Sequence, residues 1–245
     1  MPLVPAAGAA AVPRLRRRSL PAILAGAAAS GMAPAVAARD EVDLLLVLAM
    51  DASGSIDGDE FRLQREGYAA ALSHPDVLAA VASRPRGAIA VAVVEWGSPG
   101  GAATVLEWTR LAGPASARAL GESLLAAPRS PQSWNAIGDA LDHCAALVRT
   151  APFAAEDRVI DLSGDGPDLR SLRPAPAARD AAVAAGITVN ALAVAAAGQV
   201  TRAGEPLEET YRREVIGGPG AFVAVAGDRR GIARALRAKL VREIA

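Results

Sequence analysis

Hydrophobic positions along this chain follow two alternating patterns, short apolar runs and longer segments with helical spacing. Residues 44–50 are seven consecutive apolar residues, and the strand predicted around them, 42–50, has the character of a central parallel strand covered on both faces. Residues 57–72 follow, with Phe61 and Tyr68 among the side chains whose spacing predicts a helix. The pattern therefore opens as a strand followed by a helix.

Further along the chain the two patterns keep alternating. Residues 88–96 and 104–111 are strand-like, and the turn between them, 97–101, is short enough for a hairpin, so one antiparallel edge strand is expected. The remaining segments predict the helices 115–126, 136–149, 175–185, 207–215 and 231–244 and the strands 158–162, 187–194 and 221–225. Because strands that alternate with helices form mostly parallel sheets with helices on both faces, we expect a three-layer, doubly wound α/β fold.

The first 38 residues differ from the rest of the chain. They contain four arginines and no acidic residue, followed by an apolar, alanine-rich run that ends in Ala-Val-Ala at 35–37. This pattern predicts a signal peptide over 1–38, cleaved between about Ala37 and Arg39, and export to the bacterial periplasm or beyond, by either the general or the twin-arginine route. A retained membrane anchor is the weaker alternative because proline and glycine interrupt the run, so no stable membrane insertion is expected after cleavage.

Composition limits the class of protein. A chain of 245 residues with 52% apolar and 21% charged content can bury a full core, and residues 39–245 fit one domain. The leader holds four of the 26 basic residues, which leaves 22 against 26 acidic ones, a net charge of −4 that gives no reason to expect nucleic-acid binding. The single cysteine, Cys144, excludes an internal disulfide, and its apolar helical surroundings predict an inert core residue.

The first predicted strand ends in a cluster of oxygen-bearing side chains. Asp51, Ser53 and Ser55 alternate with small residues, so all three oxygens can point the same way in an extended turn. Asp165 follows a later strand, and if the two strands are neighbours both acids reach the same edge of the sheet. Hard cations such as Mg²⁺ prefer oxygen ligands, so this pattern favours a divalent metal site.

A simpler explanation of the same cluster is the start of a helix. Ser55 or Asp57 can serve as the N-cap, with Asp59 and Glu60 in the first turn to complement the helix dipole. That explanation accounts for one or two of the hydroxyl and carboxyl groups. It leaves Asp51 without a partner at the end of a buried strand.

Together these motifs resemble the metal-ion-dependent adhesion site (MIDAS) of von Willebrand factor A-type domains. Asp-x-Ser-x-Ser at 51–55, Asn-Ala-Ile-Gly-Asp-Ala-Leu at 135–141 and Ser-Gly-Asp-Gly at 163–166 look like the three loops of that site. Longer stretches, among them DASGSIDGDEF, VIDLSGDGPD, RDAAVAAGITVNALAV and VIGGPGAF, resemble a bacterial family of exported proteins of unknown function with this fold. The resemblance implies the Rossmann-like, doubly wound sheet of von Willebrand factor A domains.

The resemblance also implies a role for each loop. Ser53 and Ser55 would bind the metal directly, while Asp51 and Asp165 would hold it through water or support the ligands. Asn135 stands where such domains usually have threonine, and its carbonyl is a usable but longer oxygen ligand. The implied ion is Mg²⁺, or Mn²⁺ or Ca²⁺; a structural relic that has lost the metal is the alternative.

Neutral serine ligands leave much of a cation's charge in place, so an open coordination position should attract the Asp or Glu of a protein partner. We therefore expect a non-enzymatic, adhesion-type binding module, with a metal-dependent hydrolase as the alternative from another class. The hydrolase lacks a convincing general base, because His74 falls in a predicted loop and His143 in a predicted helix. Glu95 can border the site or pair with an arginine, and Asp168 can add a carboxylate at its rim or merely solvate it.

Overall fold

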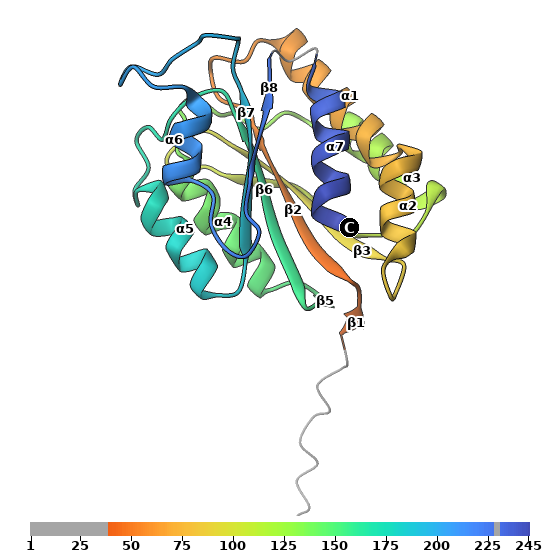
Figure 1. Ribbon diagram of the computed structural model, residues 1–245. Coiled ribbons are helices and arrows are strands. Elements are labelled where there is room, and N and C mark those ends of the chain that lie inside the picture. Colours follow the sequence, from red (N-terminus) through yellow and green to blue (C-terminus); the bar gives the residue numbers. More distant parts are fainter. Residues whose placement is uncertain (1–38, 228–230) are drawn as a thin grey trace, which may run out of the picture. The chain divides into compact units, whose positions relative to one another are not determined.

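The computed structural model describes residues 39–227 and 231–245, so the predicted leader, 1–38, lies outside the described residues (Figure 1). The strands run in the order β4-β3-β2-β6-β7-β8 within one six-stranded sheet. They are β2 (Leu44–Asp51), β3 (Ile89–Trp96), β4 (Ala103–Leu111), β6 (Asp157–Gly164), β7 (Thr188–Val194) and β8 (Val223–Ala226). Every neighbouring pair is parallel except β3 and β4, which confirms the predicted antiparallel edge.

Helices cover both faces of the sheet, as the alternating pattern predicts (Figure 1). One layer consists of α1 (Gly58–Leu72), α2 (Pro75–Ser83), α3 (Pro114–Ala126) and α7 (Ile232–Ile244). The other consists of α4 (Ile137–Arg149), α5 (Ala175–Ala184) and α6 (Leu207–Glu214). An apolar cluster lies between each layer and the sheet, and every residue of β2 is buried because both layers cover it. The three-layer fold is thereby confirmed.

Some elements were not predicted from the sequence. Helix α2 follows α1 after only two residues, and it begins at Pro75, with His74 as its N-cap. His74 lies in the connection between the two helices, as expected, and its Nδ1 accepts a hydrogen bond from the backbone N–H of Asp76 at 3.2 Å, so it also caps α2. The short strands β1 (Asp40–Glu41) and β5 (Phe153–Ala154) pair with each other in parallel and were also missed.

The core is apolar on both sides of the sheet. Cys144 is buried in it, and burial raises the pKa of its thiol, as expected for an inert core residue. Within the ranges the structure describes, no helix has the length and apolar character needed to cross a bilayer.

The strand order reverses between β2 and β6. Successive strands run outward from β2 through β3 to β4 on one side, and from β6 through β7 to β8 on the other. Because β2 and β6 pair in parallel, with Ala49 opposite Leu162, their carboxyl ends meet at the same edge of the sheet. This reversal is where open α/β sheets bind ligands, and it brings the loop after Asp51 next to the loop after Gly164.

Candidate metal centre

Asp51 links the first and third loops of the candidate site. Its Oδ1 accepts a hydrogen bond from the backbone N–H of Ser53 at 2.9 Å, and its Oδ2 accepts one from the backbone N–H of Asp165 at 3.3 Å. The Asp51 residue is fully buried. A carboxylate that accepts hydrogen bonds from the backbones of both loops holds the loops together. These bonds also give Asp51 the partners that the helix-capping explanation did not provide.

A line of side-chain oxygens crosses from one loop to the other. The Oγ atoms of Ser53 and Ser55 are 3.1 Å apart and share a hydrogen bond, and Ser55 Oγ donates to Asp165 Oδ2 at 3.0 Å. Ser53 is buried whereas Ser55 is exposed, so the line runs from the interior to the surface. The four residues predicted from the first and third motifs are therefore in direct contact.

The helix-capping explanation applies to Asp57 and not to Ser55. Asp57 Oδ1 accepts a hydrogen bond from the Glu60 backbone N–H at 2.8 Å, and Glu60 Oε2 accepts one from the Asp57 backbone N–H at 3.3 Å. This reciprocal pair is a capping box at the start of α1. Because Asp57 caps the helix, the Ser55 hydroxyl remains part of the candidate site.

The middle loop contacts both of the others through its backbone. Gly54 N–H donates to Ser133 O at 3.0 Å, and Leu169 N–H donates to Asn135 O at 2.7 Å. A Cβ atom placed on Gly166 would lie only 2.5 Å from Asn135 Nδ2, so the amide side chain packs against the backbone of the Ser-Gly-Asp-Gly loop. Three loops from separate parts of the chain therefore meet at one point.

Asn135 differs from the other candidate ligands. Its Oδ1 is buried and accepts no hydrogen bond from any residue the structure describes. A buried acceptor without a donor is unfavourable by about 1–3 kcal/mol, which is why such atoms often mark a ligand site. The structure brings the Asn135 side chain against the third loop but shows no hydrogen bond between it and Ser53 or Ser55 within the described ranges.

Two residues that the sequence analysis missed hold the first loop in shape. Arg129 Nη2 donates to three backbone carbonyls of that loop, those of Ala52, Ser53 and Ile56, at 3.0–3.2 Å. Gln64, fully buried on α1, donates through Nε2 to the Asp51 carbonyl at 2.8 Å. Each residue reaches the loop only through tertiary packing, so its position along the chain does not reveal this contact.

The two carboxylates considered for the rim serve other contacts. Glu95 is buried and pairs with Arg65, its Oε1 lying 2.5 Å from Nη2. Its second oxygen accepts hydrogen bonds from the backbone N–H and the hydroxyl of Ser130, both at 2.7 Å. Asp168 accepts from the backbone N–H of Ile137 at 2.9 Å, at the start of α4. Glu95 thus forms the arginine pair that was one of its two predicted roles.

Neither histidine of the chain is found to serve the three loops, because His74 caps α2 and His143 packs on α4. His143 shares a hydrogen bond with Thr104 at 2.9 Å, and burial lowers the pKa of its imidazole, so it is a packing residue of α4. Nowhere in the described ranges do three or more His, Cys, Asp and Glu side chains cluster in a way that could hold a metal. Any metal at the three loops would depend on the serine hydroxyls, the Asn135 amide and the carboxylates of Asp51 and Asp165.

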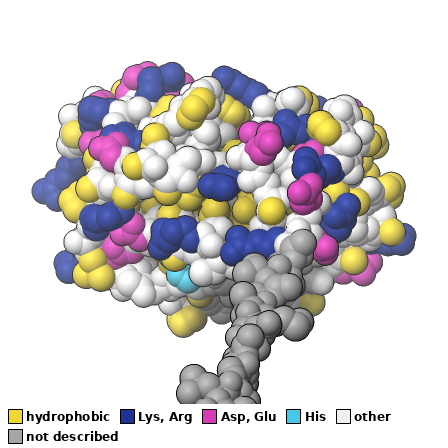
Figure 2. Space-filling view, turned by 90° about the horizontal axis from the view of Figure 1, so that it is seen from below, with side chains coloured by type: hydrophobic (Ala, Val, Ile, Leu, Met, Phe, Trp, Pro, Cys, Tyr) yellow, Lys and Arg dark blue, Asp and Glu magenta, His cyan; other side chains and the backbone are white. Residues whose placement is uncertain are grey.

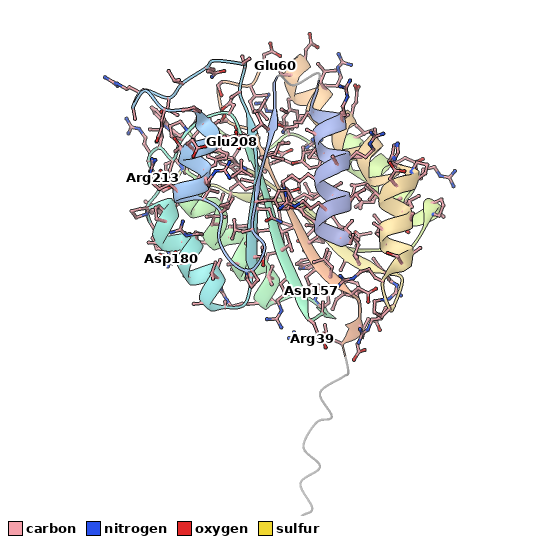
Figure 3. The ribbon with its side chains drawn as sticks, in the orientation of Figure 1. Arg39, Glu60, Asp157, Asp180, Glu208 and Arg213 are labelled. Atoms are coloured by element: carbon pink, nitrogen blue, oxygen red, sulfur yellow. The ribbon has the colours of Figure 1, made fainter. Side chains whose placement is uncertain are left out.

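Exposed apolar side chains lie beside the three loops, and a small hollow adjoins the loop that carries Asp165. Trp134, Leu169 and Leu172 are 45%, 48% and 79% exposed, and the Arg170 guanidinium lies 4.0 Å from the centre of the Trp134 ring. A hollow of about 240 Å³ is lined by Asp165 and Glu60 with five neighbouring residues. Figure 3 shows Glu60 at this end of the sheet. The site therefore opens to a surface with both apolar and charged groups.

The chain matches one protein family in sequence and several solved structures in fold. The family profile described as "Protein of unknown function (DUF1194)" matches residues 41–245. No curated protein shows significant sequence similarity to this chain. Solved structures do share its fold, beginning with a von Willebrand factor type A protein from Catenulispora acidiphila, with a TM-score of 0.56 and 19% identity over 83% of this chain and 43% of that one.

Two further solved structures share the fold. Proximal thread matrix protein 1 of the mussel byssus, solved with a zinc-occupied MIDAS motif, has a TM-score of 0.59 and 16% identity over 84% of this chain and 48% of its own. The pilus adhesin SpaC from Lactobacillus rhamnosus GG has a TM-score of 0.58 and 14% identity over 84% of this chain and 31% of its own. This chain spans less than half the length of these three proteins. It belongs to the DUF1194 family and has the fold of a von Willebrand factor A-type domain.

Proposed function

We propose that this protein is an exported, non-enzymatic binding module that holds a divalent cation and uses it to bind a carboxylate of a protein partner. The observation that carries the proposal is the line of oxygens from Ser53 through Ser55 to Asp165, with spacings of 3.1 and 3.0 Å across two loops. The residues proposed to hold the ion, Mg²⁺ or else Mn²⁺ or Ca²⁺, are Asp51, Ser53, Ser55, Asn135 and Asp165.

The donor set fits a hard cation. All five side chains offer oxygen, which Mg²⁺ and Ca²⁺ prefer, and the exposed Ser55 leaves the outer side open. The buried Asn135 Oδ1 without a donor supports the fit, because a nearby cation would satisfy an acceptor that the protein leaves unpaired. When bound, the ion would supply a positive charge for a partner's carboxylate. Arg129 would keep the loop backbone in place through its three carbonyl contacts.

The surroundings favour a protein partner. Serine hydroxyls carry no charge, and Asp51 and Asp165 would hold the ion through water or support its ligands, so the ion would keep enough charge at its open side to attract an outside carboxylate. Trp134, Leu169 and Leu172 would contact apolar groups beside that carboxylate, since they are already exposed around the loops. The pilus adhesin among the similar structures is consistent with this use of the fold. A hydrolase is the weaker alternative, since His74 caps α2 and His143 contacts Thr104.

Divalent cations are expected to raise the melting temperature of the purified protein. An ion present at about 100 times its Kd stabilises the folded state by about 2.7 kcal/mol. In a domain of this size that corresponds to an increase of roughly 5–10 °C. The variants Ser53→Ala and Ser55→Ala should each lose this increase, because each removes an oxygen from the line. Calorimetry with Mg²⁺, Mn²⁺, Ca²⁺ and EDTA measures the effect.

Ser73→Ala is the matched control, because Ser73 is also an exposed serine but lies at the other end of α1. It should keep the full response to metal. A melting temperature that no divalent ion changes would leave the three loops as a structural relic and contradict the proposal.

Partner chemistry can be tested with displayed random peptides selected on the immobilised protein in Mg²⁺ and eluted with EDTA. Peptides with Asp or Glu beside apolar residues should be enriched on the wild type, because the ion would bind the carboxylate and the exposed rim would contact the apolar side chains. The Ser53→Ala variant should lose this enrichment. Equal enrichment on both proteins, or elution that is insensitive to EDTA, would show that binding does not use the metal.

A further inference from the structure

A second group of polar side chains lies under α7, within the core and separate from the candidate metal centre. Lys239 on α7, Asp161 on β6 and Glu243 on α7 all have side chains with no exposed surface. Lys239 Nζ lies 2.6 Å from Asp161 Oδ1 and also pairs with Glu243 Oε1. Lys239 is the only lysine in the 245-residue chain. One ammonium group therefore faces two carboxyl groups without contact with water.

The contacts around this triad are incomplete. Asn190 on β7 donates through Nδ2 to Glu243 Oε1 at 2.9 Å, and the Phe222 ring lies 5.3 Å from Lys239 Nζ. The second oxygens, Asp161 Oδ2 and Glu243 Oε2, are buried and accept no hydrogen bond from the described residues. Burial, reinforced by the charge of Asp161, raises the pKa of Glu243 to about 8. Glu243 is therefore able to hold and exchange a proton near neutral pH.

We propose that Lys239 and Asp161 become joined by an intramolecular isopeptide bond, with Glu243 moving the proton between them. The geometry supports this because the Lys239 Nζ nucleophile lies 2.6 Å from Oδ1 of the Asp161 carboxyl group that it would attack, and Glu243 pairs with the same nitrogen. Two reacting groups that the fold holds next to each other react as if each were present at very high concentration. Nothing in the candidate metal centre is needed for the step.

The reaction is balanced without any other reactant. The Lys239 ammonium first passes one proton to the Asp161 carboxylate, which leaves a neutral amine beside a carboxylic acid. The Nζ lone pair then attacks Asp161 Cγ and forms the new C–N bond. Glu243 accepts a proton from Nζ and returns it to the departing hydroxyl, so that the C–O bond breaks and one water leaves. The net change converts an ammonium and a carboxylate into an amide and water.

Burial favours the product. A desolvated ion pair is stabilising only if good hydrogen bonds complete it, and here both carboxylates have an oxygen without a donor. Amide formation removes two buried charges at once. A cavity of about 670 Å³, lined by Asn190, Phe222, Glu243 and ten other residues, adjoins the triad and gives the released water an exit. The cavity extends to Asp157, which lies at the lower end of β6 in Figure 3. Figure 2 shows the molecule from that lower side.

Such a bond would attach the C-terminal helix α7 directly to β6 in the middle of the sheet. The chain has one cysteine and can form no internal disulfide. The amide bond would therefore give an exported protein a covalent cross-link that a disulfide cannot provide here.

The intact mass of the purified, folded protein tests the proposal. It should be lower than the sequence mass by one water. Because Lys239 is the only lysine, an amine-reactive label applied to the denatured chain should modify the N-terminal amine alone. Trypsin should fail to cut after Lys239, and the peptide 238–242 should be found joined to 159–170.

Glu243→Gln keeps both reacting groups but removes the proton carrier, so it should show the full sequence mass and two labelled amines. Glu208→Gln, on the exposed side of α6, is the matched control and should cross-link like the wild type. An unmodified mass of the folded wild-type protein, together with labelling of its Lys239 after denaturation, would overturn the proposal, even if a variant fails to fold. A cross-link in Glu243→Gln would overturn the role given to Glu243, and one mapped to Glu243 itself would overturn the choice of Asp161.

Discussion

Replacing Arg65 by alanine is expected to lower the free energy of unfolding by about 3–5 kcal/mol, the range for breaking a buried ion pair by removing one partner. Arg65 is only 4% exposed, and its Nη2 donates to Glu95 Oε1 at 2.5 Å. Its Nη1 donates to the Leu124 carbonyl at 3.0 Å, at the C-terminal end of α3. The substitution leaves Glu95 buried and without its counter-charge, which is the main cause of the loss.

Arg62 is the matched control on the same helix. Its side chain is 61% exposed, and its ion pairs with Asp59 and Glu66 lie at the surface. Arg62→Ala should therefore change stability by less than about 1 kcal/mol. Denaturant unfolding of both variants, followed by circular dichroism, makes the comparison. Similar losses in the two variants would mean that the Arg65–Glu95 pair contributes no more than a surface contact.

The same substitution should also affect the candidate site. Glu95 holds Ser130 by two hydrogen bonds of 2.7 Å, and the neighbouring Arg129 supports the backbone of the first loop. Without Arg65 the segment that carries Arg129 loses its direct contacts with α1, and the Glu95 carboxylate that holds Ser130 loses its counter-charge. The metal-dependent increase in melting temperature should consequently be smaller in Arg65→Ala than in Arg62→Ala.

The fold could be predicted from the sequence because the relevant signals are local. The run 44–50 is apolar throughout, and in the structure β2 is buried on both faces. Alternation with helical segments then determines a parallel sheet, and parallel neighbours place Asp51 and Asp165 at one edge. Helix α2 was missed because it has only nine residues and follows α1 almost directly. Short helices with a proline at the start have little periodicity to detect.

The supporting residues could not be predicted, because their partners are distant in sequence. Arg65 and Glu95 are 30 positions apart, and Arg129 contacts residues more than 70 positions before it. Asn135 was identified from its place in the motif, but the packing of its amide against Gly166 depends on how two loops meet. Lys239 stood in an ordinary helical pattern, and only the fold places it beside Asp161. Spacing along the chain carries no information about such contacts.

Gly138→Ala is expected to destabilise the protein by about 3 kcal/mol or more, at the upper end of the range for overpacking. A Cβ atom at this position would lie 1.9 Å from the backbone carbonyl oxygen of Arg173. That atom cannot move as a flexible side chain could, so α4 or the loop before α5 must shift. The same loop is attached to the start of α4 by Asp168 and Ser171, which accept hydrogen bonds from backbone N–H groups there. A shift would therefore also disturb the third loop of the candidate site.

Gly58→Ala provides the comparison, because Gly58 begins α1 and no atom lies within 4 Å of its added Cβ. Alanine has the higher helix propensity, so this variant should be as stable as the wild type or more stable by up to about 1 kcal/mol. Thermal and denaturant unfolding of the two variants separate a steric effect from a general effect of replacing glycine in a helix. If Gly138→Ala proved as stable as Gly58→Ala, α4 and the segment around Arg173 could not pack as closely as the structure shows, and the positions of Asn135 and Asp165 relative to each other would have to be revised.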